Sequence, residues 1–210
     1  MAQLMTLFAT EIYRAALSGA RERRLIDGLE AAALDIARED RAGQDWCRRN
    51  RYRGYTSYAS LGNIVDRASV FQDLVAILDR HVRDFARSLE LALAGERLVI
   101  DSLWVNILEP GGYHTAHLHP GSVISGTVYI RVPDGAGAIR FEDPRLAMMM
   151  AAPLRRPHAS ERRRTFVDIA PKPGAILLWE SFLRHEVPEN RARSRRISLS
   201  FNYGRSPRRA

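Results

Sequence analysis

The first part of the chain carries apolar residues at helical spacing. From Ala20 to about Asp40 they recur every three or four positions on a charged background, which predicts a helix with one buried face. A second helix is expected from Ser69 to about Leu89, and SVFQ at its start resembles a capping box. The apolar positions are Leu25, Ile26, Leu29, Ala32, Ala33 and Ile36 in the first helix and Val70, Leu74, Leu78, Val82, Phe85 and Leu89 in the second.

The pattern changes after Gly95. Short runs rich in Val, Ile, Thr, Tyr and Trp, separated by PGG, PDGAG and PKPG turns, predict β-strands. In two of them, 123–132 and 196–203, polar and apolar side chains alternate, so each strand has one polar face. We expect these polar faces to line one wet cavity of a barrel that packs under the N-terminal helices. They carry Ser125, Thr127, Tyr129 and Arg131 in the first strand and Arg196, Ser198, Ser200 and Asn202 in the second.

Length and composition favour one soluble domain. A chain of 210 residues can bury its own core, and no Gly-, Ser- or Pro-rich linker separates Leu89 from Val99. We therefore expect a single domain over 1–210, with a helical support layer at 1–95 and a β core at 96–204. Cys47 is the only cysteine, which excludes an intrachain disulfide. The sequence shows neither a signal-peptide pattern nor the roughly 20 apolar residues of a membrane span, so we expect a cytoplasmic protein without a membrane partner.

The formal net charge of +8 raises the question of nucleic acid. However, Lys172 is the only lysine among 32 basic residues, and the arginine runs are scattered with no aromatic stacking pattern between them. This pattern indicates solvated arginine faces and argues against a nucleic-acid partner. Arg131 and Arg145 are expected to form surface ion pairs, although either could also bind an anionic substrate.

Half of the six histidines lie in HTAHLHPGSVISG, residues 114–126. If HLHP lies at a strand end, His117 and His119 point to the same side and both can reach one metal ion, whereas His114 has the opposite parity and should face elsewhere. An H-x-H pair alone is weak evidence, because two histidines can equally hydrogen-bond in a core. We expect His185, which follows the apolar strand AILLW, to be the third ligand.

Arg196 follows His185 after ten intervening residues and begins an R-x-S unit with Ser198. This combination resembles the signature of the Fe(II)- and 2-oxoglutarate-dependent oxygenases. More narrowly, the chain is similar to a group of these enzymes with five elements in the same order. Here they are W-x-N (Trp104, Asn106), HLHP, SGTVY, FEDPR (141–145) and RISLSFN.

The resemblance implies a mainly β fold with N-terminal helices, in which a double-stranded β-helix, or jelly-roll, holds Fe(II) and 2-oxoglutarate. His117 and His185 match the family's two histidines. Arg196 matches the arginine that pairs with the distal carboxylate of 2-oxoglutarate, and Ser198 and Tyr129 are expected to donate hydrogen bonds to it. The implied reaction is the hydroxylation of a substrate coupled to the decarboxylation of 2-oxoglutarate.

His119 departs from the family's pattern, because that position usually holds Asp or Glu. A three-histidine site is favoured, with Asp143 of FEDPR as the alternative to His119. Two other functions stay open: a cupin-type three-histidine dioxygenase that uses no 2-oxoglutarate, and a metal- or dicarboxylate-binding protein without enzymatic activity. The substrate is expected to be a small molecule or peptide that the sequence does not identify. The sequence is also compatible with a homodimer.

Overall fold

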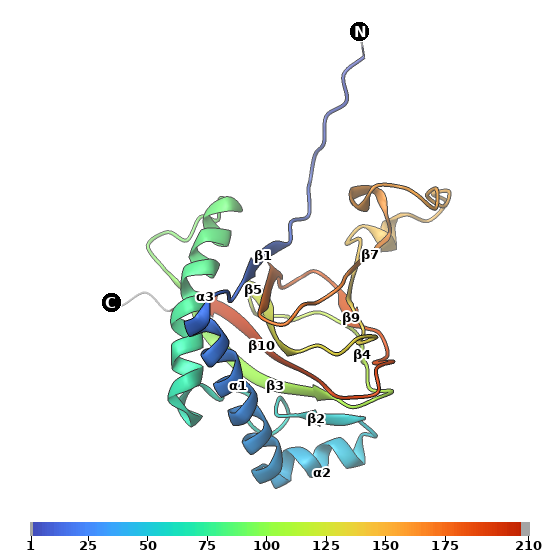
Figure 1. Ribbon diagram of the computed structural model, residues 1–210. Helices are drawn as coiled ribbons and strands as arrows, with labels where there is room; N and C mark the ends of the chain where they lie inside the picture. The colour runs from blue at the N-terminus through green and yellow to red at the C-terminus, as the bar shows by residue number, and fades with distance from the viewer. Residues whose placement is uncertain (1, 207–210) are drawn as a thin grey trace.

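Two antiparallel β-sheets and three α-helices make up residues 2–206, the part of the chain that the computed structural model describes (Figure 1). The helices are α1 (Ala20–Glu39), α2 (Arg41–Arg49) and α3 (Ser69–Ser88), with short 3₁₀ turns at Val65–Arg67, Leu146–Met148 and Glu161–Arg163. The strands are β1 (Tyr13–Ala16), β2 (Gly54–Thr56), β3 (Leu98–Leu108), β4 (His114–His117), β5 (Ile124–Arg131), β6 (Ile139–Glu142), β7 (Phe166–Ile169), β8 (Ala175–Glu180), β9 (His185–Val187) and β10 (Arg196–Arg205). None of the described helices has the length and apolar character needed to cross a membrane.

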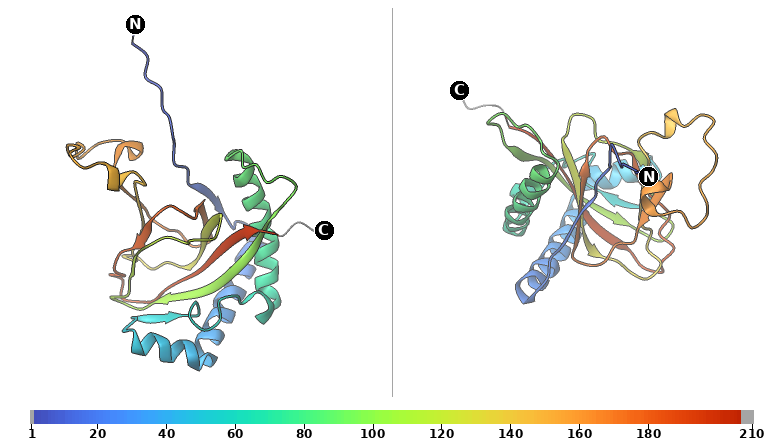
Figure 2. Two further views of the ribbon diagram at one scale, coloured as in Figure 1. Left: turned by 180° about the vertical axis from the view of Figure 1, so that it is seen from behind. Right: turned by 90° about the horizontal axis from the view of Figure 1, so that it is seen from above.

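The larger sheet has six strands in the order β1-β8-β5-β10-β3-β2, and the smaller has four in the order β4-β9-β6-β7. Helices α1 and α3 lie on one side of the sheets, and the loop between β6 and β7 projects on the other (Figure 2). The expected mainly β fold with N-terminal helices is confirmed. The long segment between β6 and β7 has a 3₁₀ turn near each end.

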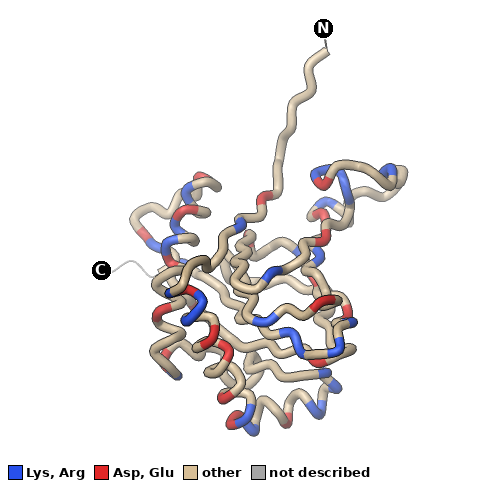
Figure 3. Tube along the Cα trace, viewed as in Figure 1, with Lys and Arg blue, Asp and Glu red and all other residues tan. Residues whose placement is uncertain are grey.

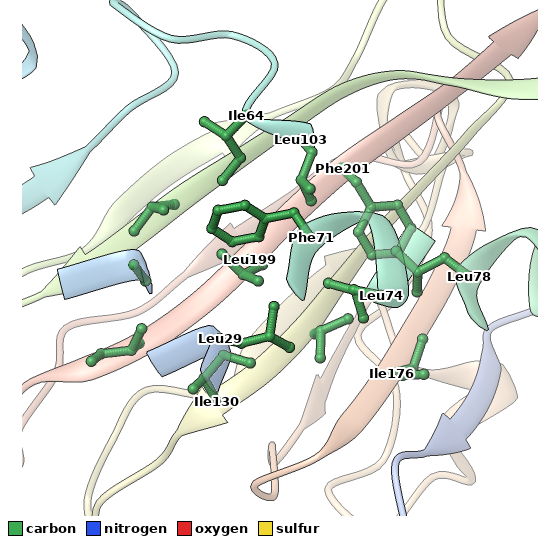
Figure 4. Packing of buried hydrophobic residues seen from close by; sticks show 14 of the residues in the cluster. Leu29, Ile64, Phe71, Leu74, Leu78, Leu103, Ile130, Ile176, Leu199 and Phe201 are labelled. Carbon is green, nitrogen blue, oxygen red and sulfur yellow. The ribbon is translucent and has the colours of Figure 1, made fainter. Parts of the chain in front are cut away.

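The outer face of the six-stranded sheet forms the main core with α1 and α3 (Figure 4). Apolar residues of both helices meet the apolar face of β10, where Ile197, Leu199, Phe201 and Tyr203 are fully buried. Gly126 of β5 lies under Phe201, and a Cβ there would come within 2.4 Å of the Phe201 ring, so only glycine fits. The opposite face of β10 is left for Arg196, Ser198 and Ser200, as the alternation predicts.

Two expectations about residues 1–95 need correction, and one helix in this segment was not predicted. Helix α3 begins at Ser69 as predicted, but SVFQ is not a capping box, because Ala68 is the N-cap and no side chain caps the helix. The segment is not only helical, since β1 pairs with β8 and β2 pairs with β3 at the two edges of the larger sheet. Helix α2 was not predicted, because RAGQDWCRR has too few apolar positions to show a period.

Basic and acidic positions are interspersed along the helices (Figure 3). The surface ion pairs expected of Arg131 and Arg145 are confirmed, with Glu30 and Asp143 as their partners. Arg131 reaches Glu30 of α1 because the pairing of β5 with β10 shifts between Ile197 and Ser198, which turns Arg131 away from the polar face of its strand.

Candidate metal centre

Three histidines from β4, its following turn and β9 converge on one point. Strands β4 and β9 are antiparallel, and their register sets His117 opposite His185. His119 lies in the turn after β4, where its backbone N–H donates to the Ser181 carbonyl at 3.1 Å. The ring centroids are 4.4 Å apart for His117 and His185, 5.1 Å for His117 and His119, and 5.3 Å for His119 and His185. One nitrogen from each ring lies within 4.8 Å of the other two, which suits a common metal ion.

Backbone carbonyl oxygens orient two of these rings. The Nδ1 atom of His117 lies 2.7 Å from the Thr115 carbonyl oxygen, and that of His185 lies 2.9 Å from the Leu183 carbonyl oxygen. A carbonyl can only accept, so each Nδ1 carries the ring proton and each Nε2 keeps a free lone pair. This is the arrangement by which proteins orient metal-binding imidazoles.

The cavity keeps His119 and His185 uncharged. Burial, together with a smaller effect of the neighbouring His117, lowers the pKa of His185 to about 3. Burial and His117 likewise lower the pKa of His119 to about 4. Neutral imidazoles are the form that binds metal, so the chemistry of this donor set fits a divalent ion.

Asp143, the alternative ligand, lies elsewhere. It forms two hydrogen bonds with the Arg145 guanidinium, from Nε at 2.9 Å and from Nη2 at 2.8 Å, and the Arg145 backbone N–H also donates to it. These bonds hold the pKa of the Asp143 carboxyl below its usual range. Asp143 lines a separate cavity beside the N-terminal segment and does not join the three histidines.

The residues expected to bind 2-oxoglutarate lie together and line the same cavity as the histidines. Register sets Ser198 of β10 opposite Tyr129 of β5. Arg196 is 2 % exposed, its Nη1 lies 3.4 Å from the Ser198 hydroxyl, and its guanidinium carbon lies 5.0 Å from the centre of the Tyr129 ring. No carboxylate of residues 2–206 pairs with Arg196, and both its Nε and the Tyr129 hydroxyl are buried without a hydrogen-bond partner. A buried guanidinium with unused donors is costly unless an anion meets it, so these residues fit a carboxylate ligand.

Sequence reasoning missed a fourth histidine. His114 was expected to face elsewhere, but it lines the same cavity, because the pairing of β4 with β9 is irregular between His114 and His117 and the parity of the strand is lost. Its Nε2 lies 3.0 Å from the Tyr52 hydroxyl. Burial and the nearby Arg196 charge lower the pKa of His114 to about 3. Tyr52 lies 62 positions away in the chain, so no local pattern predicts this pair.

Other motif residues hold the strands together. The Asn106 amide donates to the Ser200 hydroxyl at 2.9 Å and its oxygen accepts from Thr56 at 2.9 Å, which connects β2, β3 and β10. Ser125 of β5 donates to the Asn202 side-chain oxygen of β10 at 2.8 Å. Buried polar residues satisfied in this way fix the register of the sheet around the site.

The site opens into a cavity of about 540 Å³. Both sheets contribute to its walls, and the segment from Trp46 to Tyr58 forms part of its lining. All three tryptophans of the chain, Trp46, Trp104 and Trp179, line it, whereas no Asp or Glu of the described residues does. Aromatic walls with a few converging polar groups are typical of sites for small molecules.

The chain is similar to known proteins in both sequence and fold. The family described as "Putative 2OG-Fe(II) oxygenase" matches residues 102–202. No curated protein matches the sequence. Among solved structures, a Pseudomonas putida prolyl-4-hydroxylase is 16% identical with a TM-score of 0.62, covering 94% of each chain.

Two further solved structures share this fold. The non-heme α-ketoglutarate-dependent carbocyclase SnoK from nogalamycin biosynthesis is 13% identical with a TM-score of 0.62, covering 92% of this chain and 79% of its own. HygX from Streptomyces hygroscopicus, crystallised with nickel and 2-oxoglutarate, is 14% identical with a TM-score of 0.57, covering 93% and 82%. The expected double-stranded β-helix is confirmed.

Proposed function

We propose that this chain is a 2-oxoglutarate- and Fe(II)-dependent oxygenase, the family that matches residues 102–202, and that His117, His119 and His185 hold its iron. Arg196, Ser198 and Tyr129 bind the distal carboxylate of 2-oxoglutarate in the same cavity. The observation that supports this assignment is that the cavity contains both three converging imidazoles and a buried guanidinium without an ion-pair partner among the described residues. When bound, Fe(II) and 2-oxoglutarate supply the oxidising chemistry, in which O2 converts 2-oxoglutarate to succinate and CO2 while a substrate is oxidised.

The side chains of this protein bind and orient the reacting groups. The carbonyl groups of Thr115 and Leu183 hold the rings of His117 and His185 so that their Nε2 atoms face the cavity. Arg196 presents a planar pair of N–H donors, which fixes both the position and the plane of a carboxylate. Trp179 packs edge-on against His185 with ring centroids 4.7 Å apart and keeps water from that side of the ligand.

The ligand set contains no carboxylate. Three neutral imidazoles leave the full positive charge of the ion in the cavity, where anionic ligands such as 2-oxoglutarate compensate for it. No observation favours the cupin-type alternative, because an enzyme that does not use 2-oxoglutarate has no need for a buried arginine in this position. The same arginine and histidines would serve a non-enzymatic binding protein, and release of CO2 from 2-oxoglutarate would exclude that alternative.

Metal binding tests the ligand assignment. We expect His117→Ala and His185→Ala to lose stoichiometric Fe(II) under anaerobic reconstitution, and His119→Ala to bind it much more weakly. His119→Asp should keep the metal, because a carboxylate is an equally good ligand at this position. His158→Ala, in the exposed loop between β6 and β7, is the matched control and should bind Fe(II) like wild type. Stoichiometric iron in His117→Ala or His185→Ala would contradict the assignment.

Cosubstrate turnover tests the reaction. With Fe(II) present, 2-oxoglutarate labelled at the carboxylate that is lost should release labelled CO2, and this release should vanish in His185→Ala. An iron-loaded wild-type protein that binds 2-oxoglutarate without ever releasing CO2 would favour a binding function.

A further inference from the structure

The cavity has a rim that lies outside the part of the chain matched by the family. The proposed ligands of iron and 2-oxoglutarate all fall within residues 102–202. Helix α2, β2 and the turn between them supply another part of the lining, from Trp46 to Tyr58. A substrate that enters this cavity therefore contacts side chains from outside the residues that the family matches.

Arg51 occupies an unusual backbone position on this rim. Helix α2 ends in a Schellman motif, in which the Tyr52 N–H donates to the Cys47 carbonyl at 2.9 Å and the Arg51 N–H donates to the Arg48 carbonyl at 3.2 Å. This motif requires a left-handed residue, usually glycine, and Arg51 has φ 54°. A residue with a side chain is strained here, and such strain is often found where the side chain has a function.

Arg51 and Arg53 are two unpaired positive charges at the cavity mouth. Both are exposed, both line the cavity, and neither has a side-chain hydrogen bond or ion pair with any described residue. Arg53 stands over Gly111, where a Cβ would come within 2.3 Å of its Nη1. Many other arginines of the chain do have acidic partners, among them Arg131, Arg140 and Arg184. With no acidic side chain in the lining, a negative charge in this cavity must come from a ligand.

Aromatic side chains share this cavity with the two arginines. Trp46, Tyr58 and Tyr113 line the same cavity, and Tyr58 and Tyr113 are more than half exposed, at 57% and 56%. Exposed aromatic rings beside cationic groups suit a ligand with an apolar body and an anionic group.

We propose that Arg51 and Arg53 bind the anionic group of the substrate, and that its apolar or aromatic body lies against Trp46, Tyr58 and Tyr113. The substrate class is therefore a small organic anion, a carboxylate or a phosphate ester. This proposal rests on the proposed function, since it assigns the substrate of that same cavity. It differs from cosubstrate binding because Arg196, deeper in the site, is taken by 2-oxoglutarate.

The tryptophans provide the measurement. Because all three line the cavity, their fluorescence reports on ligands that enter it. The probes are phenylacetate and its neutral counterpart phenylacetamide, titrated anaerobically into the holoenzyme saturated with Fe(II) and 2-oxoglutarate. We expect phenylacetate to bind about fivefold more tightly than phenylacetamide, the scale of one partly exposed ion pair. Phenyl phosphate, measured in parallel, distinguishes a phosphate site from a carboxylate site, and tighter binding of either anion supports the proposal.

Four variants test whether the preference for the anion depends on Arg51 and Arg53. Arg51→Gln and Arg53→Gln should each reduce the preference for the anion, whereas Arg49→Gln, an exposed residue of α2 outside the cavity, should not. Arg51→Gly gives a sharper test, because glycine relieves the left-handed strain. It should raise the melting temperature while weakening phenylacetate binding, which a merely structural role for Arg51 would not do.

Three results would overturn the proposal. These are equal affinities for the acid and the amide in wild type, unchanged anion binding in Arg51→Gly and Arg53→Gln, or loss of the visible Fe(II)–2-oxoglutarate absorption band on adding phenylacetate. The last would mean that the probe displaces the cosubstrate at Arg196. If the band never forms in wild type, the proposed function itself fails, so the two failures are distinguishable.

Discussion

At the scale of single residues, Arg196 best illustrates how burial creates a function. Its guanidinium is almost inaccessible, rests on the Tyr129 ring and has no acidic partner among the described residues. We expect Arg196→Ala to bind Fe(II) normally but to weaken 2-oxoglutarate by about 2–5 kcal/mol, the usual cost of removing one partner from a buried charge pair. Arg196→Lys should restore only part of the affinity, because an ammonium group cannot form the planar bidentate contact. Calorimetric titration of 2-oxoglutarate into the iron-loaded variants measures both effects.

The neighbouring Arg195 provides the control for this prediction. It lies on the opposite face of the chain, half-exposed, with its Nε 3.6 Å from a Glu109 carboxylate oxygen. Arg195→Ala should leave the affinity for 2-oxoglutarate unchanged. Equal affinities in wild type and Arg196→Ala would remove the cosubstrate assignment and promote the cupin-type alternative.

At the scale of elements, Asp40 joins α1 to α2 and to the strand beyond. Its carboxylate accepts hydrogen bonds from the Gly43 N–H at 3.0 Å, from the Tyr55 hydroxyl at 2.7 Å and from Ser60. Burial raises the pKa of this carboxyl, but the hydrogen bonds lower it more, so the pKa lies below its usual value. The charged form therefore stabilises the junction from which Arg51 and Tyr52 extend into the rim.

The pH dependence of stability tests this junction. Because the pKa of Asp40 is lower in the folded state, its contribution is fully present above the unfolded pKa, near 4, and is lost as the pH falls through the folded value. We expect Asp40→Asn to lower the free energy of unfolding by about 1 kcal/mol at neutral pH. The difference from wild type should shrink as the pH falls below about 4, measured by urea denaturation. The exposed Asp73→Asn should match wild type throughout, and a constant difference for Asp40→Asn would contradict this account.

A partly buried hydrogen bond links strand β10 to α3. The Tyr203 side chain is fully buried, and its hydroxyl donates to Asp79 of α3 at 2.8 Å. We expect Tyr203→Phe to lower the free energy of unfolding by about 1.5–3 kcal/mol, because the Asp79 carboxylate loses its donor. Chemical denaturation measures the loss, with the half-exposed Tyr113→Phe as the control. A loss no larger than that of the control would mean that water satisfies Asp79.

At the scale of the whole molecule, residues 1–95 are part of the β fold. They supply the two edge strands β1 and β2 of the six-stranded sheet, and α1 and α3 cover its outer face. A chain that starts near Gly95 would expose that apolar face and leave the sheet edges next to β8 and β3 open. We predict that it aggregates, as judged by size-exclusion chromatography.

A shorter deletion tests whether aggregation results from the exposed apolar face and not merely from shortening the chain. Residues 2–9 are exposed, so removing them should leave a soluble protein that still binds Fe(II). If a fragment starting near Gly95 were soluble, folded and able to bind metal, the N-terminal part would not be needed for the β fold, which would contradict this prediction.

The sequence by itself determined the features that follow from local geometry. Alternation along β10 assigned Arg196 and Ser198 to the face opposite Ile197 and Leu199, because successive side chains of a strand point to opposite sides. Helical spacing likewise predicted α1 and α3 with nearly correct bounds. The resemblance to the family predicted that His117 and the distant His185 converge. The spacing of the histidines alone only suggests this.

Only the tertiary structure decided the features that depend on contacts between distant segments. An irregular register between β4 and β9 turned His114 into the cavity, and Tyr52 met it from 62 positions away. The fold placed Asp143 in a separate cavity and His119 beside His117 and His185. The end of α2 then carried Arg51 to the cavity mouth. Local periodicity does not encode any of these contacts, because each is set by how whole elements pack, and packing is decided by the burial of the entire apolar surface at once.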